Sequence, residues 1–162
     1  MRRLLLLTVI LLPFIVSSQN FIVKDGSILW QKVYEGTPSF RVLSDVEKLD
    51  SIIIGKIENH STNYKKQGYG SMNVPILVRD ELLNANARID IKEGRYRVTL
   101  TNIVFSNTNQ YLGAIGSPTT AESYFIKKGN ITDRPAMLSI LKIIDVDLED
   151  LFTPDTPDKD NW

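Results

Sequence analysis

The chain of 162 residues is long enough for one globular domain with a hydrophobic core and too short for two domains of ordinary size. It contains 19 basic and 19 acidic residues and no cysteine, which excludes a disulfide framework and a lipid-modified cysteine. The balanced charge lacks the basic excess with which nucleic-acid-binding proteins neutralise phosphates, so we expect no nucleic-acid partner.

The N-terminal stretch has the features of a secretory signal peptide. Met1-Arg2-Arg3 is a basic start, residues 4–16 are apolar, and Val16-Ser17-Ser18 fits a cleavage site. We therefore predict a signal peptide over residues 1–18 and a mature protein that is periplasmic, on the cell surface or secreted. An uncleaved membrane anchor is the alternative. The apolar run is shorter than the ~20 residues that cross a bilayer, which favours cleavage and no membrane span afterwards.

The mature chain begins with a predicted hairpin. Residues 21–23 and 28–34 form its two strands around the turn Lys24-Asp25-Gly26-Ser27. Apolar residues fall on both faces where the second strand begins, which is typical of a strand inside a sheet. Further along, Ser44-Asp45-Val46-Glu47 has the spacing of a capping box and predicts a short helix over about residues 45–50.

The next segment combines one clear strand with a long polar connection. Residues 52–58 are rich in β-branched side chains and predict a strand, with a bulge at Gly55. Residues 59–73 are polar and rich in glycine, so we expect a mobile connection or the tip of a hairpin. Residues 74–78 contain Pro75 and fit an edge strand.

The most distinct element is a β-hairpin over residues 87–105. A two-residue turn at Glu93-Gly94 pairs Lys92 with Arg95 and sets the register of both strands. In this register the apolar side chains share one face, namely Ala87, Ile89, Ile91, Tyr96, Val98 and Leu100. Beyond them the alternation changes parity, which predicts a bulge near Thr101-Asn102 or a strand end that is covered on both faces.

The C-terminal third contains a second strong element, an amphipathic helix. Residues 106–129 are polar and turn-rich, with a short strand predicted at residues 124–127. Asp133 is the expected N-cap of a helix that continues to residue 152. Its apolar residues recur at helical spacing; they are Met137, Ile140, Leu141, Ile144, Leu148 and Leu151. The expected exposed face carries Ser139, Lys142, Asp145 and Glu149. We predict one domain over residues 19–152 and a disordered acidic, proline-containing tail over residues 153–162.

Two segments carry a resemblance to a known family. They are IVKDGSILWQKVYEG, with its Trp30-Gln31-Lys32-Val33-Tyr34, and IDIKEGRYRVTLTNIVF, with its Gly94-Arg95-Tyr96-Arg97. Together they resemble exported bacterial proteins of unknown function with a fold like that of the TATA-box-binding protein (TBP). The resemblance implies an antiparallel sheet with helices on one face and transfers no catalytic or binding residue. We therefore predict an α+β, TBP-like fold in which an antiparallel β-sheet has helices packed on one face.

The sequence offers little catalytic chemistry. His60 is the only histidine, and within a polar segment we predict that it is solvated. An enzyme would need to bring two or more of a small set into one pocket, namely His60, Glu58, Asp80, Glu81 and Asp145. The acidic run at residues 145–150 lacks the glycine and spacing of a calcium loop and is predicted to be a solvated helix face. We predict no catalytic residue, no metal site and no cofactor.

The polar face of the central hairpin is the one candidate binding surface. It gathers Arg88, Lys92, Arg95 and Arg97. Arginine suits bidentate contacts with carboxylates, which favours a partner-docking surface, whereas a solvated sheet face is the alternative interpretation. Gly68-Tyr69-Gly70 is compatible with a tyrosine presented for recognition or with simple flexibility.

Two functions from different classes remain open. The first is an exported, non-enzymatic binding or accessory module of the cell envelope with an unknown protein or glycan partner. The alternative is a cell-envelope hydrolase whose site cannot be read from the sequence.

Overall fold

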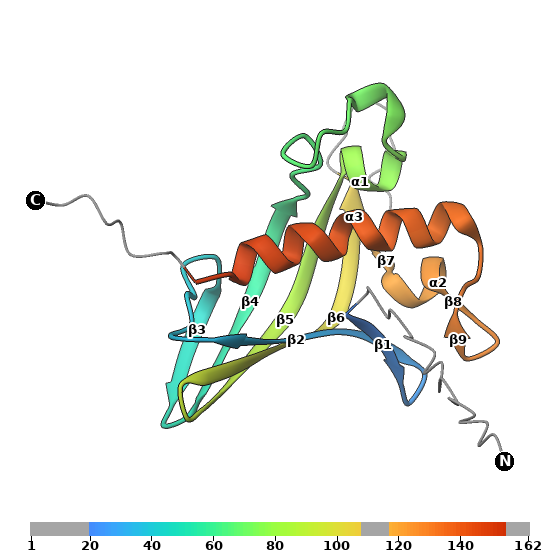
Figure 1. Cartoon of the computed structure of the whole chain (residues 1–162). Helices are drawn as coiled ribbons and strands as arrows, with labels where there is room; N and C mark the ends of the chain where they lie inside the picture. Colours follow the sequence, from blue (N-terminus) through green and yellow to red (C-terminus); the bar gives the residue numbers. More distant parts are fainter. Residues whose placement is uncertain (1–19, 108–116, 155–162) are drawn as a thin grey trace, which may run out of the picture.

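The computed structural model describes residues 20–107 and 117–154 (Figure 1). The predicted signal peptide, the tail from residue 155 onward and residues 108–116 of the polar, turn-rich segment lie outside these residues. The described chain forms an α+β domain in which a seven-stranded antiparallel sheet is crossed on one face by a long helix. This is the predicted fold class.

The described chain contains two β-sheets and four helices. The strands of the main sheet are β1 (Phe21–Lys24), β2 (Ser27–Glu35), β3 (Ser44–Leu49), β4 (Ile52–Ser61), β5 (Glu81–Lys92), β6 (Arg95–Asn107) and β7 (Thr119–Thr120). They are arranged β1-β2-β6-β5-β4-β3, and β7 pairs with β6. A separate two-stranded sheet contains β8 (Ile126–Lys127) and β9 (Asn130–Ile131). The helices are η1 (Ser71–Asn73), α1 (Ile76–Asp80), α2 (Ala121–Phe125) and α3 (Pro135–Phe152).

The central hairpin has the predicted register. Lys92 lies opposite Arg95 and Ala87 lies opposite Leu100. Glu93 and Gly94 have φ angles of 49° and 75°, which is the left-handed geometry of a tight two-residue turn. The apolar side chains of both strands face α3, and those of Ile89, Val98 and Leu100 are 0% exposed. The prediction of a hairpin with one buried face is therefore confirmed.

The predicted bulge near Thr101-Asn102 is also present. Asn86 pairs with Thr101, whereas Asn84 pairs with Val104, so β6 contains one residue more than β5 across this interval. Asn102 adopts a φ of 51°, as an asparagine does more readily than most residues. The extra residue returns the next apolar side chains to the buried face, where Ile103 is 1% and Phe105 is 3% exposed.

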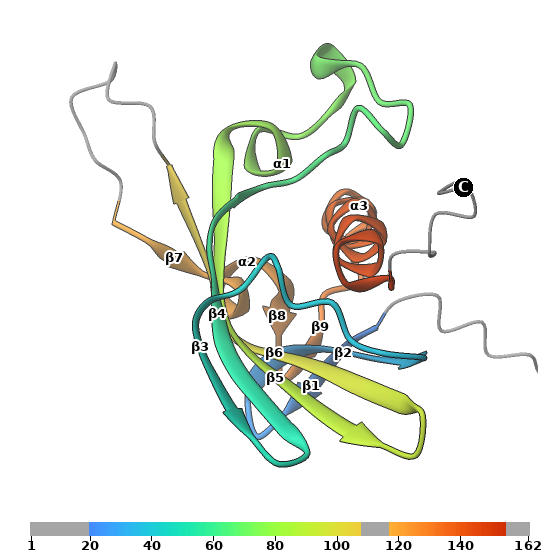
Figure 2. The same cartoon turned by 90° about the vertical axis from the view of Figure 1, so that its left-hand side faces the viewer.

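Helix α3 closes the core from one side of the sheet (Figure 2). The ring of Phe152 stacks on that of Trp30 with a centroid distance of 6.0 Å. The helix is confirmed, although its N-cap is Arg134 and not Asp133. No side chain caps this end, and Pro135 occupies the first helical position, where its missing N–H group costs nothing.

Three local predictions were wrong, each for its own reason. The capping-box segment is strand β3, which pairs with β4 and accommodates an irregularity between Ser44 and Glu47. The segment after Pro75 is helix α1, since a proline is tolerated at a helix start and Val78 is 1% exposed in the core. Gly55 is not bulged. It lies in regular register opposite Ala87, and a Cβ atom there would come within 3.1 Å of Leu43.

The short strand predicted over residues 124–127 is confirmed only at its second half, because Tyr124 and Phe125 end helix α2. Within residues 20–107 and 117–154, no helix is both long and apolar enough to cross a membrane.

Candidate functional site

The predicted binding surface lies on the face of β5 and β6 that points away from α3. Arg88, Lys92, Arg95 and Arg97 are all exposed there. Asp90 joins two of them, because its carboxylate accepts hydrogen bonds from Arg88 Nε at 2.8 Å and from Arg97 Nη2 at 3.0 Å. These two bonds hold the pKa of Asp90 below its usual range, and the bond from Arg88 is the larger cause.

The other two cations lie at the turn. Lys92 and Arg95 face each other across the strands there, and neither forms an ion pair within the described part of the chain, although Glu35 lies opposite Arg95 on β2. They border a shallow hollow of about 310 Å³, lined by Val33, Asp90, Lys92, Arg95, Tyr96 and Arg97. Val33 is 57% exposed on β2. The hollow therefore combines an exposed apolar side chain with two cations that form no ion pair among the described residues, and Arg88 lies outside its lining.

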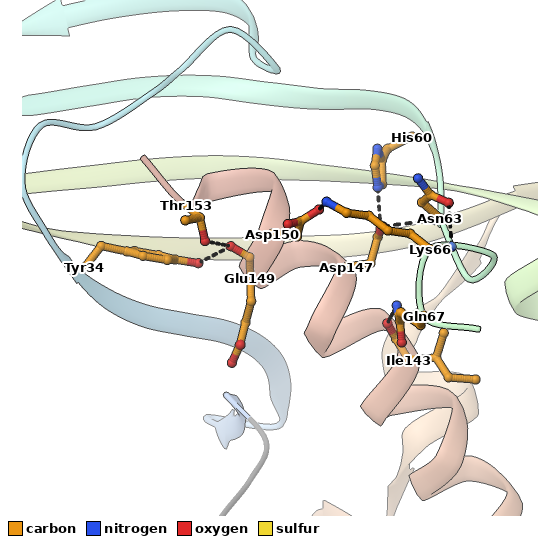
Figure 3. A network of polar contacts seen from close by, with 10 residues as sticks. All are labelled: Tyr34, His60, Asn63, Lys66, Gln67, Ile143, Asp147, Glu149, Asp150 and Thr153. Carbon is orange, nitrogen blue, oxygen red and sulfur yellow. Dashed lines mark hydrogen bonds and ion pairs between the residues drawn. The ribbon is translucent and has the colours of Figure 1, made fainter. Parts of the chain in front are cut away.

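His60 is not a solvated loop residue, as the sequence predicted, but belongs to β4. Ile57 pairs with Ala85 and His60 with Leu83, so β4 has an extra residue in this interval, where Asn59 adopts a φ of 53°. The bulge turns the imidazole toward α3. There its Nε2 atom lies 2.6 Å from Oδ2 of Asp147, whose side chain is 7% exposed (Figure 3).

The acidic run of α3 is not a solvated face either. Asp145, at 2% exposed, accepts hydrogen bonds from Trp30 Nε1 at 2.7 Å and from Asn20 Nδ2 at 2.9 Å. Asp147 accepts a second bond from the backbone N–H of Asn63 at 2.9 Å. These two carboxylates are buried because Asn20, strand β2 and the segment that follows β4 pack against this part of the helix, and each supplies donors.

Residues 62–70 pack along α3, where the sequence predicted a mobile connection or a hairpin tip. Lys66 forms an ion pair with Asp150, and Gln67 Nε2 donates to the carbonyl oxygen of Ile143 at 2.9 Å (Figure 3). Between this segment and the helix lies a hollow of about 360 Å³. We call it the loop–helix hollow, and its lining residues are Asn63, Lys66, Gln67, Tyr69, Val146, Asp147 and Asp150.

The remaining candidates for catalysis are dispersed. Glu58 is exposed on β4, and Asp80 forms a bidentate pair with the neighbouring Arg79. Burial raises the pKa of Glu81, which is partly opposed by a hydrogen bond with Tyr124. None of these three lines either hollow. Among the residues that the structure describes, no group of three or more His, Cys, Asp or Glu side chains could bind a metal ion.

No protein-family model matches the chain, and no curated protein matches it. Among solved structures, it is similar to a TBP-like protein from Parabacteroides distasonis ATCC 8503. The two chains are 14% identical, the match covers 80% of this chain and 90% of the other, and the TM-score is 0.46. That protein is named TBP-like, and the likeness concerns the fold alone.

Proposed function

We propose that the protein is an exported, non-enzymatic binding module of the cell envelope, and that it binds a carboxylate-bearing partner through the open face of its sheet. The observation that carries this proposal is the pair Lys92 and Arg95, which lie beside the exposed Val33 and form no ion pair within the described residues. Export is supported by the basic start and the apolar residues 4–16.

The chemistry of the hollow favours a carboxylate over a neutral ligand. Arg95 can donate two parallel hydrogen bonds to a carboxylate, and Lys92 adds a point charge on the same side. Arg97 is oriented by Asp90, so the side of the hollow next to Arg97 is fixed before any partner arrives. Val33, which is 57% exposed, supplies an apolar contact that gives such a surface affinity beyond that of charge alone.

Charge reversal tests this surface directly. The double variant Lys92→Glu with Arg95→Glu should lower the affinity for a fluorescent polyglutamate peptide by about tenfold or more, measured by anisotropy at low salt. The matched control is Lys127→Glu with Lys128→Glu on the β8–β9 hairpin, which changes the net charge equally at exposed positions. Photocrosslinking on whole cells with a probe at residue 33 would then identify the partner. Equal loss of peptide binding in both variants would show that only net charge matters.

A second candidate function is favoured by one specific contact. A buried carboxylate that orients a histidine, as Asp147 does with His60, is half of the arrangement that hydrolases use to activate a nucleophile. Within the described residues no hydroxyl group forms a hydrogen bond with His60, whose Nε2 atom is paired with Asp147. Incubation of the purified protein with peptidoglycan, glycan and ester substrates decides between the two functions. Turnover that disappears in folded His60→Ala would replace the binding proposal.

A further inference from the structure

A second surface of the molecule has the composition of a ligand site, on the side of the sheet where α3 lies. The loop–helix hollow is separate from the basic hollow and shares no residue with it. Its volume of about 360 Å³ is at the lower end of the range of about 300–1,000 Å³ that small-molecule sites occupy.

The charges in the hollow compensate one another. Lys66 is paired with Asp150, and the carboxylate of Asp147 is held by His60 and by the backbone N–H of Asn63. A strongly charged ligand would have to displace these pairs. A neutral ligand can keep them and use the hydrogen-bonding capacity that they leave over.

That remaining capacity includes both donors and acceptors. The Nδ2 group of Asn63 and the hydroxyl group of Tyr69 have no partner in the described chain. The amide oxygen of Gln67 is likewise open, since its Nε2 group is committed to Ile143, and Asp150 keeps its Oδ1 atom. Adjacent hydroxyl groups, each of which both donates and accepts, match such a set better than a ligand with one kind of polar group.

Two side chains give the hollow apolar walls. Tyr69 is 38% exposed and Val146 is 41% exposed. The turn before Tyr69 is fixed, because Gly68 has a φ of 84° and its N–H group donates to the carbonyl oxygen of Lys65 at 2.9 Å. An aromatic ring held beside amide and carboxylate groups can lie against the C–H face of a sugar ring while the polar groups contact its hydroxyls.

We infer that the loop–helix hollow is a binding site for a neutral saccharide, with Tyr69 as the apolar platform and Gln67 and Asp150 as hydroxyl acceptors. His60 is a positioning residue, because it orients Asp147 and so fixes the segment that begins at Asn63. The inference does not depend on the basic face.

Titration of the mature chain with neutral oligosaccharides tests this site. A neutral glycan array selects the probe, with chitotetraose, cellotetraose and maltotetraose included, and amide chemical shifts are then followed in solution. Binding should shift the amide signals of residues 63–69 and 143–150. Tyr69→Ala should weaken binding by about tenfold and Gln67→Ala by several-fold, whereas Tyr69→Phe should retain most of the affinity.

The matched controls are Asn130→Ala, which removes an exposed amide on β9, and the Lys92→Glu with Arg95→Glu variant. Both should bind the selected glycan as the unmodified protein does. Circular dichroism verifies that each variant is folded. Failure of every neutral glycan to bind, unchanged affinity in Tyr69→Ala, or a preference for anionic glycans would overturn the inference.

Discussion

Single residues decide how α3 is held, because several of its polar side chains are buried and satisfied. No buried side-chain nitrogen or oxygen in the described residues lacks a hydrogen-bond partner. Asp145 shows why this matters. Its carboxylate satisfies the indole N–H of Trp30, which is 0% exposed and could not find water if the carboxylate were removed.

Asp145→Ala should destabilise the protein by about 1–3 kcal/mol, because it leaves the buried Trp30 N–H without its acceptor and removes one of the two acceptors of Asn20 Nδ2. The matched control is Asp150→Ala on the same helix, which breaks an exposed ion pair and should cost about 0–1 kcal/mol. Urea denaturation monitored by tryptophan fluorescence measures both. Similar losses in the two variants would mean that burial of Asp145 does not determine its contribution.

The contacts of His60 and Asp145 could not be predicted from the sequence. The inward direction of His60 depends on the bulge at Asn59, and nothing in the polar run around that residue distinguishes a bulge from a regular strand or a loop. On a helical wheel Asp145 lies opposite the apolar positions of α3. Its burial can be predicted only if one knows that Trp30 presents an N–H group there.

At the scale of elements, prediction succeeded where the pattern itself determines the pairing. The Ala87–Leu100 register follows from strict alternation and a two-residue turn, and a slip by one residue would expose every apolar side chain. The capping box at Ser44 failed because the same few residues also fit an edge strand, and β4 offers a neighbour. Local signals of four residues are too weak to outweigh the hydrogen bonds of a ladder.

Substitutions in the turn of the central hairpin should change the stability of the protein. Glu93 has a φ of 49°, a conformation that asparagine tolerates better than glutamate. We expect Glu93→Asn to stabilise the protein by about 0.5–1 kcal/mol, and Gly94→Ala, at a φ of 75°, to destabilise it by about 1 kcal/mol.

Glu35→Asn on β2 is the control for the turn, because Glu35 is exposed on a strand and has no positive φ. This variant should be neutral or slightly destabilising, since asparagine is disfavoured in strands. Thermal unfolding followed by circular dichroism measures all three variants. An equal gain from both asparagine substitutions would show that the turn conformation is not the cause.

At the scale of the whole molecule, two tyrosines join the sheet to the last turn of α3. The hydroxyl of Tyr96 donates to the carbonyl oxygen of Phe152 at 2.6 Å, and that of Tyr34 donates to the carbonyl oxygen of Glu149 at 3.2 Å. The two rings stack with a centroid distance of 5.1 Å. Strands β2 and β6 are thus hydrogen-bonded to the same end of the helix. Both hydrogen bonds require that the phenol groups remain protonated.

This arrangement predicts that the protein loses stability in alkali. Burial raises the pKa of Tyr96 from its usual value near 10 to about 12, and burial followed by the charge of Glu149 raises the pKa of Tyr34 further. Because the pKa of Tyr96 is raised in the folded state, the contribution of its phenol to stability is fully present below about pH 10 and is lost as the pH rises from about 10 to about 12.

Tyr96→Phe should cost about 0.5–1.5 kcal/mol of stability at about pH 8, where it removes a hydrogen bond, and this deficit should shrink toward about pH 11. Urea unfolding across this pH range, with phenol ionisation followed by absorbance, measures the difference, and Tyr69→Phe is the exposed control. A deficit that stays constant with pH would mean that the buried phenol of Tyr96 does not resist ionisation.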